Sequence, residues 1–322
     1  MPPQRTQQKQ NNHSNMSISR SSDDGGSSAV PTTGPTPSPP AFPLLGITVR
    51  RLGRLVDELP GGRQSLAGLE MYKLWRGGVL DPLSGWTGCS TKPSLCERLQ
   101  AEGDAGVGIA TWFVSYTAKE IFLDLLDALE IFFEGEAQGL DTVVWFCEAS
   151  FDSKRPTPQG PTQDDYGFLL AVFKCAVEST RNLVMFMSTW DKPSALTRAW
   201  CMWELYCCCS CGGRVEFALP RAQRVQLMEV MRSNPATFFD IIAALRSENS
   251  TANDNSSREA VFAAIPAEVG FSGLDAVVRR ALWDWMERLL RAKIEEARGA
   301  GKEEEAAGLL NAVGMLHSHR GG

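Results

Sequence analysis

Residues 182–219 read NLVMFMSTWDKPSALTRAWCMWELYCCCSCGGRVEFAL. The stretch begins with the apolar run NLVMFMS (182–188), continues with a helical pattern over 195–209, and ends with RVEFAL (214–219), which Pro220 closes. Short runs that are apolar throughout predict strands buried on both faces. A helix between two such strands predicts a parallel sheet, because parallel neighbours need a crossover connection.

The same alternation extends upstream. Two more apolar runs, ATWFVS (110–115) and TVVWFC (142–147), flank a stretch of helical spacing over 119–133, and a further amphipathic helix is predicted over 167–179. A strand-to-strand spacing of about 30–40 residues fits right-handed βαβ units. The sequence therefore predicts an α/β fold with a doubly wound parallel sheet covered by helices on both faces.

Composition divides the chain around this α/β domain, which we place at 104–220. Residues 1–42 are rich in Ser, Pro and Gln and predict a disordered tail, because they cannot bury enough apolar area to offset their ordering entropy. Residues 43–103 are of mixed composition and predict a lead-in segment that packs on the core. Residues 221–322 predict a helical module. Its expected helices cover 222–232, 237–246, 258–265, 274–297 and 302–316.

Histidine is scarce, and its positions exclude several chemistries. The three histidines are His13, His317 and His319, all near the termini of the chain. The interior therefore cannot supply a Ser-His-Asp or Cys-His catalytic group or a His-liganded zinc site. Chemistry in the core has to come from carboxylates, cysteines, Lys or Arg side chains, or backbone groups.

Charge and cysteine usage favour a reduced intracellular compartment. The net charge is −6 with both signs spread along the chain, which predicts neither a nucleic-acid partner nor an anionic membrane surface. No apolar run approaches the ~18 residues of a membrane span. The N-terminus lacks the apolar stretch of a secretory signal, so nine cysteines are read as free thiols. We expect a cytoplasmic protein.

The cysteine cluster after residue 200 has two interpretations. Cys208 and Cys211 have the CxxC spacing once, but no second pair completes four zinc ligands. We therefore favour buried thiols that pack as small hydrophobic side chains and expect no metal site. The phosphate-binding pattern GxxxxGK[ST] is absent from the sequence, which excludes a P-loop ATPase.

A single carboxylate stands out in residues 190–205. Glu204 lies among Trp200, Trp203 and Leu205, an unusually apolar setting, on a helix that follows a predicted strand. In open α/β sheets, ligands bind beyond the carboxyl ends of the strands, where such helices begin. Alternatively, Glu204 pairs with Arg198 or Lys192, or is solvated, and the tryptophans belong to the core.

Three segments resemble the Toll/interleukin-1 receptor (TIR) domain. FVSYTAKEIFLDLLDAL (113–129) resembles its first strand and helix, SFDSKRPTPQGPTQDD (150–165) occupies the place of its long loop, and WCMWEL (200–205) resembles its Trp-Cys-x-x-Glu-Leu helix. More closely, about 48–292 resembles TIR-like proteins of algae, oomycetes and other protists, in which tetratricopeptide or kinesin-light-chain-like repeats often follow. The resemblance implies a flavodoxin-like core with a helical C-terminal module.

The resemblance first implies a signalling or scaffold module that acts through homotypic protein–protein interaction. The contact surface would be the long loop around Lys154, Arg155 and Pro156, and the partners a second copy or other TIR or repeat-containing proteins. A further interpretation makes the chain the front end of a repeat scaffold, with Trp283 and Trp285 in a docking element.

The alternative implied by the resemblance is cleavage of the nicotinamide–ribose bond of NAD⁺, with Glu204 as the catalytic carboxylate. NAD⁺ would be the substrate, and no cofactor is expected. Substrate-binding candidates are Ser115, Tyr116, Trp190, Trp200 and Trp203. A carboxylate can stabilise the positive charge that develops on the ribose without a histidine or a metal. We rank interaction before catalysis, because one motif carries the enzymatic implication. Residues 117–120 read TAKE, where plant-type TIR domains usually have a Gly/Asp/Arg cluster.

Overall fold

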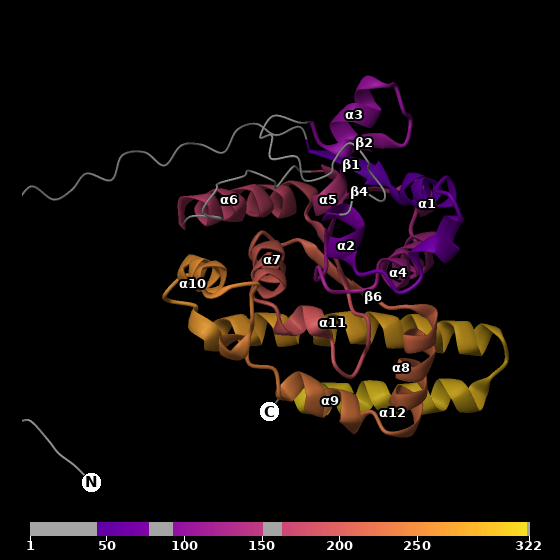
Figure 1. Cartoon of the computed structure of the whole chain (residues 1–322). Coiled ribbons are helices and arrows are strands. Elements are labelled where there is room, and N and C mark those ends of the chain that lie inside the picture. Colours follow the sequence, from indigo (N-terminus) through magenta and orange to yellow (C-terminus); the bar gives the residue numbers. More distant parts are fainter. Residues whose placement is uncertain (1–43, 77–92, 151–162, 321–322) are drawn as a thin grey trace, which may run out of the picture. The chain divides into compact units, whose positions relative to one another are not determined.

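The computed structural model of the chain describes residues 44–76, 93–150 and 163–320 (Figure 1). These residues belong to one compact unit, Pro39–Gly322. The predicted disordered tail 1–42 and the predicted interaction loop with Lys154, Arg155 and Pro156 lie outside the described residues.

A six-stranded mixed sheet in the order β2-β1-β4-β3-β5-β6 organises the described residues (Figure 1). Neighbours among β3 to β6 are parallel, whereas β1 runs antiparallel to both β2 and β4. The predicted α/β class is confirmed. The prediction of a parallel sheet holds for four strands and is wrong for the β1–β2 edge. The strands are β1 Leu45–Thr48, β2 Val107–Ile109, β3 Trp112–Ser115, β4 Val143–Trp145, β5 Asn182–Phe186 and β6 Arg214–Ala218.

Strand β1 brings the segment before the α/β domain into the sheet itself. All four of its residues are buried, and a Cβ atom at Gly46 would lie 2.3 Å from the Val144 carbonyl oxygen. Only glycine therefore allows β1 to approach β4 this closely. A four-residue run that contains glycine is too short to be distinguished from a loop by its pattern, which is why the sequence did not predict this strand.

Two hydrophobic clusters lie on opposite faces of the sheet, because successive strand residues point to opposite sides. Phe113 of β3 belongs to one cluster, together with the buried residues of α6 and α7, and Val114 belongs to the other, together with those of α1 and α4. Figure 1 shows these helix pairs on the two sides of the sheet. The predicted covering of both faces is confirmed.

The helices of the α/β part follow the predicted order, with altered bounds. Strand β4 ends at Trp145, two residues before the predicted end, and a short helix follows it. The helices are α1 Val49–Asp57, α2 Met71–Arg76, α3 Leu95–Ala101, α4 Phe122–Glu134, α5 Cys147–Ser150, α6 Gln163–Thr180 and α7 Ala199–Ser210, and the 3-10 turns are η1 Gly62–Leu66, η2 Gly139–Asp141 and η3 Ser194–Thr197.

The predicted helix over 195–209 is broken at Arg198, which separates η3 from α7. Arg198 has an extended backbone (φ −107°, ψ 126°). The neighbouring backbone groups pair with a distant segment: Thr251 donates its N–H to the Thr197 carbonyl (2.8 Å), and Ala199 donates to the Thr251 carbonyl (2.9 Å). These long-range hydrogen bonds replace helical ones, so the break follows from tertiary structure.

After β6 the chain is helical, as predicted. The elements are α8 Arg221–Ser233, α9 Ala236–Ala243, η4 Ser247–Asn249, α10 Asn255–Ala264, α11 Gly270–Gly299 and α12 Glu303–Arg320. The cluster on the α6–α7 face of the sheet continues without interruption into α11 and α12. Phe217 of β6 meets Trp285 of α11 with ring centroids 5.1 Å apart. Sheet and C-terminal helices therefore share one core.

Candidate functional site

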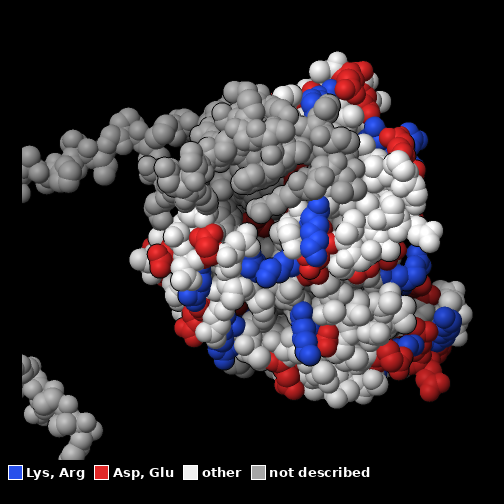
Figure 2. Space-filling model, in the orientation of Figure 1, with Lys and Arg blue, Asp and Glu red and all other residues white. Residues whose placement is uncertain are grey.

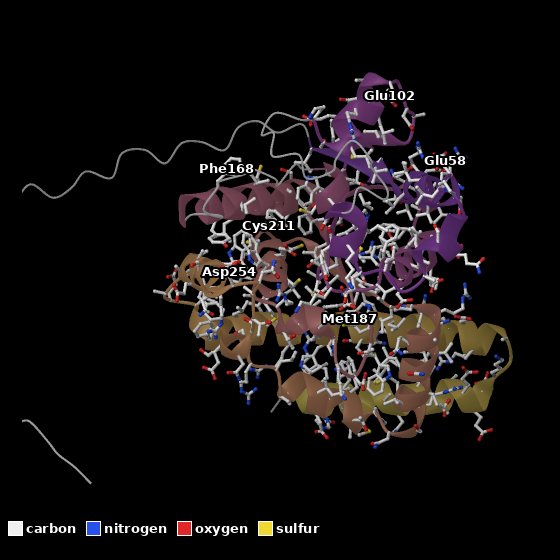
Figure 3. All side chains as sticks on the ribbon, viewed as in Figure 1. Glu58, Glu102, Phe168, Met187, Cys211 and Asp254 are labelled. Carbon is white, nitrogen blue, oxygen red and sulfur yellow. The ribbon has the colours of Figure 1, made fainter. Side chains whose placement is uncertain are left out.

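The candidate site lies where β3 and β5 end and α7 begins. Ser115 is the last residue of β3, and the chain reaches η3 and α7 shortly after β5. Met187, just after β5, lies inside the fold (Figure 3) and is 1% exposed. The carboxyl ends of adjacent parallel strands lie at the same edge of the sheet, which is the usual ligand-binding edge of this class of fold.

Ser115 and Glu204 meet at this edge. The Ser115 hydroxyl donates a hydrogen bond to Glu204 Oε2 over 2.6 Å, and the two residues are 1% and 4% exposed. They are 89 residues apart in the sequence. The structure thus brings together the carboxylate and the hydroxyl that the sequence indicated as candidates.

Burial changes the acidity of Glu204. Removal of the carboxylate from water raises its pKa from 4.5 to about 8, and the negative charge of Glu148 in α5 acts in the same direction. The hydrogen bond from Ser115 stabilises the charged form and opposes this rise. Glu204 is therefore mainly protonated at neutral pH, and a nearby positive charge would favour its ionisation.

Glu204 does not pair with Arg198, one of the alternatives left open by the sequence. Arg198 Nη2 donates instead to Asn253 Oδ1 over 2.6 Å. Within the described residues no ion pair involves Glu204, and an exposure of 4% excludes a solvated side chain. The carboxylate is thus held by a neutral hydroxyl inside the protein.

Tyr116 follows Ser115 and contacts Phe146, just before α5, and Cys201 of α7. Its ring stacks on Phe146 at 4.9 Å, and its carbonyl oxygen accepts a hydrogen bond from the Cys201 thiol over 3.4 Å. The Tyr116 hydroxyl is buried and has no hydrogen-bond partner among the described residues. Burial raises the pKa of the Cys201 thiol, as does the charge of Glu204, so this cysteine is a neutral hydrogen-bond donor.

A second carboxylate at the same edge was not singled out from the sequence. Glu120, in the loop between β3 and α4, is 8% exposed, and its carboxylate accepts a hydrogen bond from the Ser194 hydroxyl of η3. The available signal was an acidic residue between the end of the first strand and an apolar helix. Such a residue is also typical of a solvated helix start, so the pattern alone could not place it.

The three candidate tryptophans contact other parts of the fold. Trp200 Nε1 donates to the Ser257 hydroxyl of α10 over 2.8 Å, and Trp203 packs edge-on against Trp200 at 6.3 Å. The Trp190 backbone N–H donates to Gln223 Oε1 of α8 over 3.3 Å. In the described structure no ring contact or side-chain hydrogen bond joins these tryptophans to Ser115, Tyr116 or Glu204. Consecutive helix residues are about 100° apart around the axis, so Trp203 and Glu204 point in different directions.

Trp203 also lines a cavity of about 320 Å³ between α6 and α7. Its other lining residues are Leu170, Ala171, Lys174, Glu178, Tyr206, Cys207, Ser210, Ala264 and Pro266. Ser115, Tyr116 and Glu204 are not among them, so this cavity is distinct from the candidate site.

The cysteines after residue 200 are free thiols. Burial raises the pKa of Cys207 and Cys208 to about 12, which makes them poor nucleophiles and poor ligands. In the described parts of the chain, no group of three or more His, Cys, Asp or Glu residues is arranged to hold a metal ion. Packing as small apolar side chains accounts for Cys207 and Cys208.

The described surface seen in one view carries mixed charge. On the face shown in Figure 2, the Lys and Arg side chains of the described residues are interspersed with Asp and Glu. None of the helices in the described ranges combines the length and apolar character needed to cross a membrane. A scan against protein-family models gives no match, and no curated protein or solved structure matches the chain.

Proposed function

We propose that this chain is a TIR-like protein with a flavodoxin-like core and that it cleaves the nicotinamide–ribose bond of NAD⁺, with Glu204 as the acting carboxylate. The order of the parallel strands supports the fold assignment. Numbered along the chain, β3 to β6 lie in the sheet as 2-1-3-4, which is the start of the flavodoxin-like order 2-1-3-4-5. The WCMWEL motif (200–205) supports the family assignment.

The hydrogen bond between Ser115 and Glu204 carries the functional proposal. It places a hydroxyl on a buried carboxylate oxygen at the ligand-binding edge of the sheet. A ribose hydroxyl of a bound nucleotide can take the position of the Ser115 hydroxyl on the same oxygen. A carboxylate so placed stabilises the oxocarbenium-like ribose that forms as the glycosidic bond breaks.

The reaction balances without a cofactor. Nicotinamide leaves with the electron pair of the glycosidic bond, and water adds to the ribose carbon and releases one proton, which gives ADP-ribose. The positive charge of the bound nicotinamide ring favours ionisation of Glu204, which offsets the effect of burial on its pKa. Substrate binding would therefore generate the charged form that the reaction needs.

The homotypic-interaction interpretation stays a prediction from the sequence. Its proposed contact residues, Lys154, Arg155 and Pro156, lie outside the described residues, so no contact in the structure favours it. The hydrogen bond between Ser115 and Glu204 favours the catalytic interpretation over homotypic interaction.

The proposal is tested by release of nicotinamide from NAD⁺. The purified full-length chain, concentrated and crowded to promote assembly, should release nicotinamide, measured by liquid chromatography. Glu204→Gln keeps the shape of the side chain and an acceptor for Ser115 but removes the charge. We expect a loss of about 100-fold or more, the scale for removal of one transition-state electrostatic group. At NAD⁺ concentrations far below KM, release by the wild type should increase with pH towards 8, because kcat/KM reports the ionisation of Glu204 in the free protein.

Glu295→Gln is the matched control, because the Glu295 side chain is exposed and belongs to α11. It should release nicotinamide at the wild-type rate. A folded wild-type protein that releases no nicotinamide above buffer would end the catalytic proposal, as would full activity of Glu204→Gln.

A further inference from the structure

Three side-chain hydrogen bonds join the segment 115–120 to the segment 194–204. Ser115 bonds to Glu204, the Tyr116 carbonyl to Cys201, and Glu120 to Ser194. As the residue number increases from 115 to 120, the residue number of the partner decreases from 204 to 194. The two segments therefore lie antiparallel along each other, and we call this set of three contacts the seam.

The first segment of the seam is also held from its other side. Met71 donates its backbone N–H to the Glu120 carbonyl over 2.8 Å, and Tyr72 donates to the Ala118 carbonyl over 3.0 Å. These bonds come from the start of α2. Because the backbone around Glu120 is fixed by its neighbours, its carboxylate is a fixed attachment point for whatever binds to it.

The second segment has a break in it. Arg198 is extended and separates η3 from α7, which begins at Ala199. Helical hydrogen bonds of α7 therefore do not fix the position of η3, and other contacts have to hold it. The backbone pairing with Thr251 holds this junction on one side. On the sheet side, the Ser194 hydroxyl binds Glu120 at the far end of the seam from Glu204.

We propose that Glu120 is a positioning residue of the candidate site: through Ser194 it anchors η3 and the start of α7, and so keeps Glu204 in register with Ser115. A carboxylate buried to this extent is costly unless it is hydrogen-bonded, and the Ser194 hydroxyl donates a hydrogen bond to the carboxylate of Glu120. The effect on NAD⁺ cleavage rests on the proposed function. The geometric claim concerns the position of Glu204 itself.

The test uses two readouts on the full-length chain. The first is the titration of Glu204, followed by NMR of ¹³C-labelled glutamate carboxyl groups, with Glu204→Gln identifying the signal. The second is nicotinamide release, with kcat and KM determined separately. The main variants are Ser194→Ala, which removes the donor, and Ser194→Thr, which keeps a hydroxyl. Ser233→Ala in α8 is the matched control, because its hydroxyl donates to the Glu229 carbonyl of its own helix.

In Ser194→Ala, water should reach the loosened seam and lower the apparent pKa of Glu204 by at least about one unit, since burial is the main cause of its rise. The kcat should fall about 10- to 100-fold with KM changed far less, as expected for a displaced catalytic group. Ser194→Thr should restore both values, and Ser233→Ala should match the wild type. Glu120→Ala should shift the Glu204 pKa and kcat as much as Ser194→Ala does. The Glu120→Ala/Ser194→Ala double variant should show no larger shift than either single variant. Glu120→Gln, which keeps a hydrogen-bond acceptor, should show a smaller loss than Glu120→Ala.

An unchanged Glu204 titration in folded Ser194→Ala would overturn the positioning role, whatever the activity. A shift that Ser194→Thr does not reverse would overturn it as well. If the wild type releases no nicotinamide while Ser194→Ala still shifts the titration and Ser194→Thr restores it, the proposed function fails and the positioning role stands. Should Glu120→Ala fail to fold, the Ser194 pair decides alone.

Discussion

Glu204 is the residue in which stability and proposed activity oppose each other. It is buried at the edge of the sheet, where its neutral form is favoured, whereas stabilisation of a cationic ribose requires its charged form. Carboxylates with raised pKa values are common at functional sites, because the environment that suits a reaction seldom suits the resting charge state. Ser115 moderates this conflict by donating to the carboxylate.

This conflict predicts a pH dependence of folding. The pKa of Glu204 is about 8 in the folded chain and near its ordinary 4.5 when unfolded. Between these values the folded state holds a proton that the unfolded state has released, so the free energy of unfolding falls as pH rises from about 5 to 8. The slope is at most about 1.4 kcal/mol per pH unit for one group. Urea unfolding at four pH values should show this loss in the wild type relative to Glu204→Gln.

Glu204→Gln is its own control in this experiment, because all other titrating groups are common to both chains. Parallel curves for the two proteins over pH 5–8 would contradict a raised pKa for Glu204. A wild-type curve that continues to fall relative to the variant above pH 8 would place the folded-state pKa of Glu204 higher still.

At the scale of elements, the contact between β6 and α11 joins the sheet to the C-terminal helices. Glu216 of β6 is buried and accepts from Arg214 Nε (3.0 Å) and from Arg288 Nε of α11 (3.1 Å). Arg288 also donates to the Val215 carbonyl over 2.8 Å. Within the described sheet β6 is an edge strand, and this arginine supplies a hydrogen-bond donor to its backbone.

Removal of the Glu216 carboxylate should therefore loosen this contact. Glu216→Ala leaves two arginines without their buried acceptor, and we expect a loss of about 2 kcal/mol in the free energy of unfolding, the scale for hydrogen bonds to charged groups. The two arginines are about half exposed, so water limits the cost. Urea denaturation gives the value.

Glu295→Ala is the matched control on α11, since its pair with Arg298 is exposed on both sides. It should cost less than about 1 kcal/mol. Equal effects of Glu216→Ala and Glu295→Ala would show that the β6–α11 contact does not depend on the buried carboxylate.

At the scale of the molecule, the sequence boundary at residue 220 does not separate two cores. Phe113 and Leu183 of the sheet belong to the same hydrophobic cluster as Leu290 of α11 and Leu309 of α12. The boundary marks a change from alternating strands and helices to helices alone. The C-terminal helices cover apolar surface that the α/β part presents.

Truncation after Pro220 should therefore give a chain that does not fold cooperatively. Loss of 221–322 would expose Phe217 and the apolar surface that α11 covers, and exposed patches of this kind favour aggregation. Circular dichroism should show no cooperative thermal transition for the 1–220 chain, or the chain should be recovered only as aggregate. Co-expression of 221–322 should restore a soluble complex, because the shared core can reform. A soluble 1–220 chain with a sharp transition near that of the full chain would contradict the shared core.

Much of the order of elements was predictable from local pattern. The four parallel strands were each indicated by a short apolar run, and the long helices by their apolar spacing. Two signals indicated the candidate pair Ser115 and Glu204. These were their positions after predicted strands and the resemblance to the TIR domain. Strand β1 and the break at Arg198 were not predictable, since Gly46 weakens the first signal and a distant Thr251 imposes the second.

The sequence by itself determined the four parallel strands, the long helices and their apolar faces, because the periods of strand and helix are local properties of the chain. Only the tertiary structure decided that Glu204 meets Ser115 and not Arg198, that Glu120 reaches Ser194, and that Trp200 of the motif contacts α6 and α10. These pairings join residues far apart in the chain. Their geometry depends on how whole elements pack, which no local period encodes.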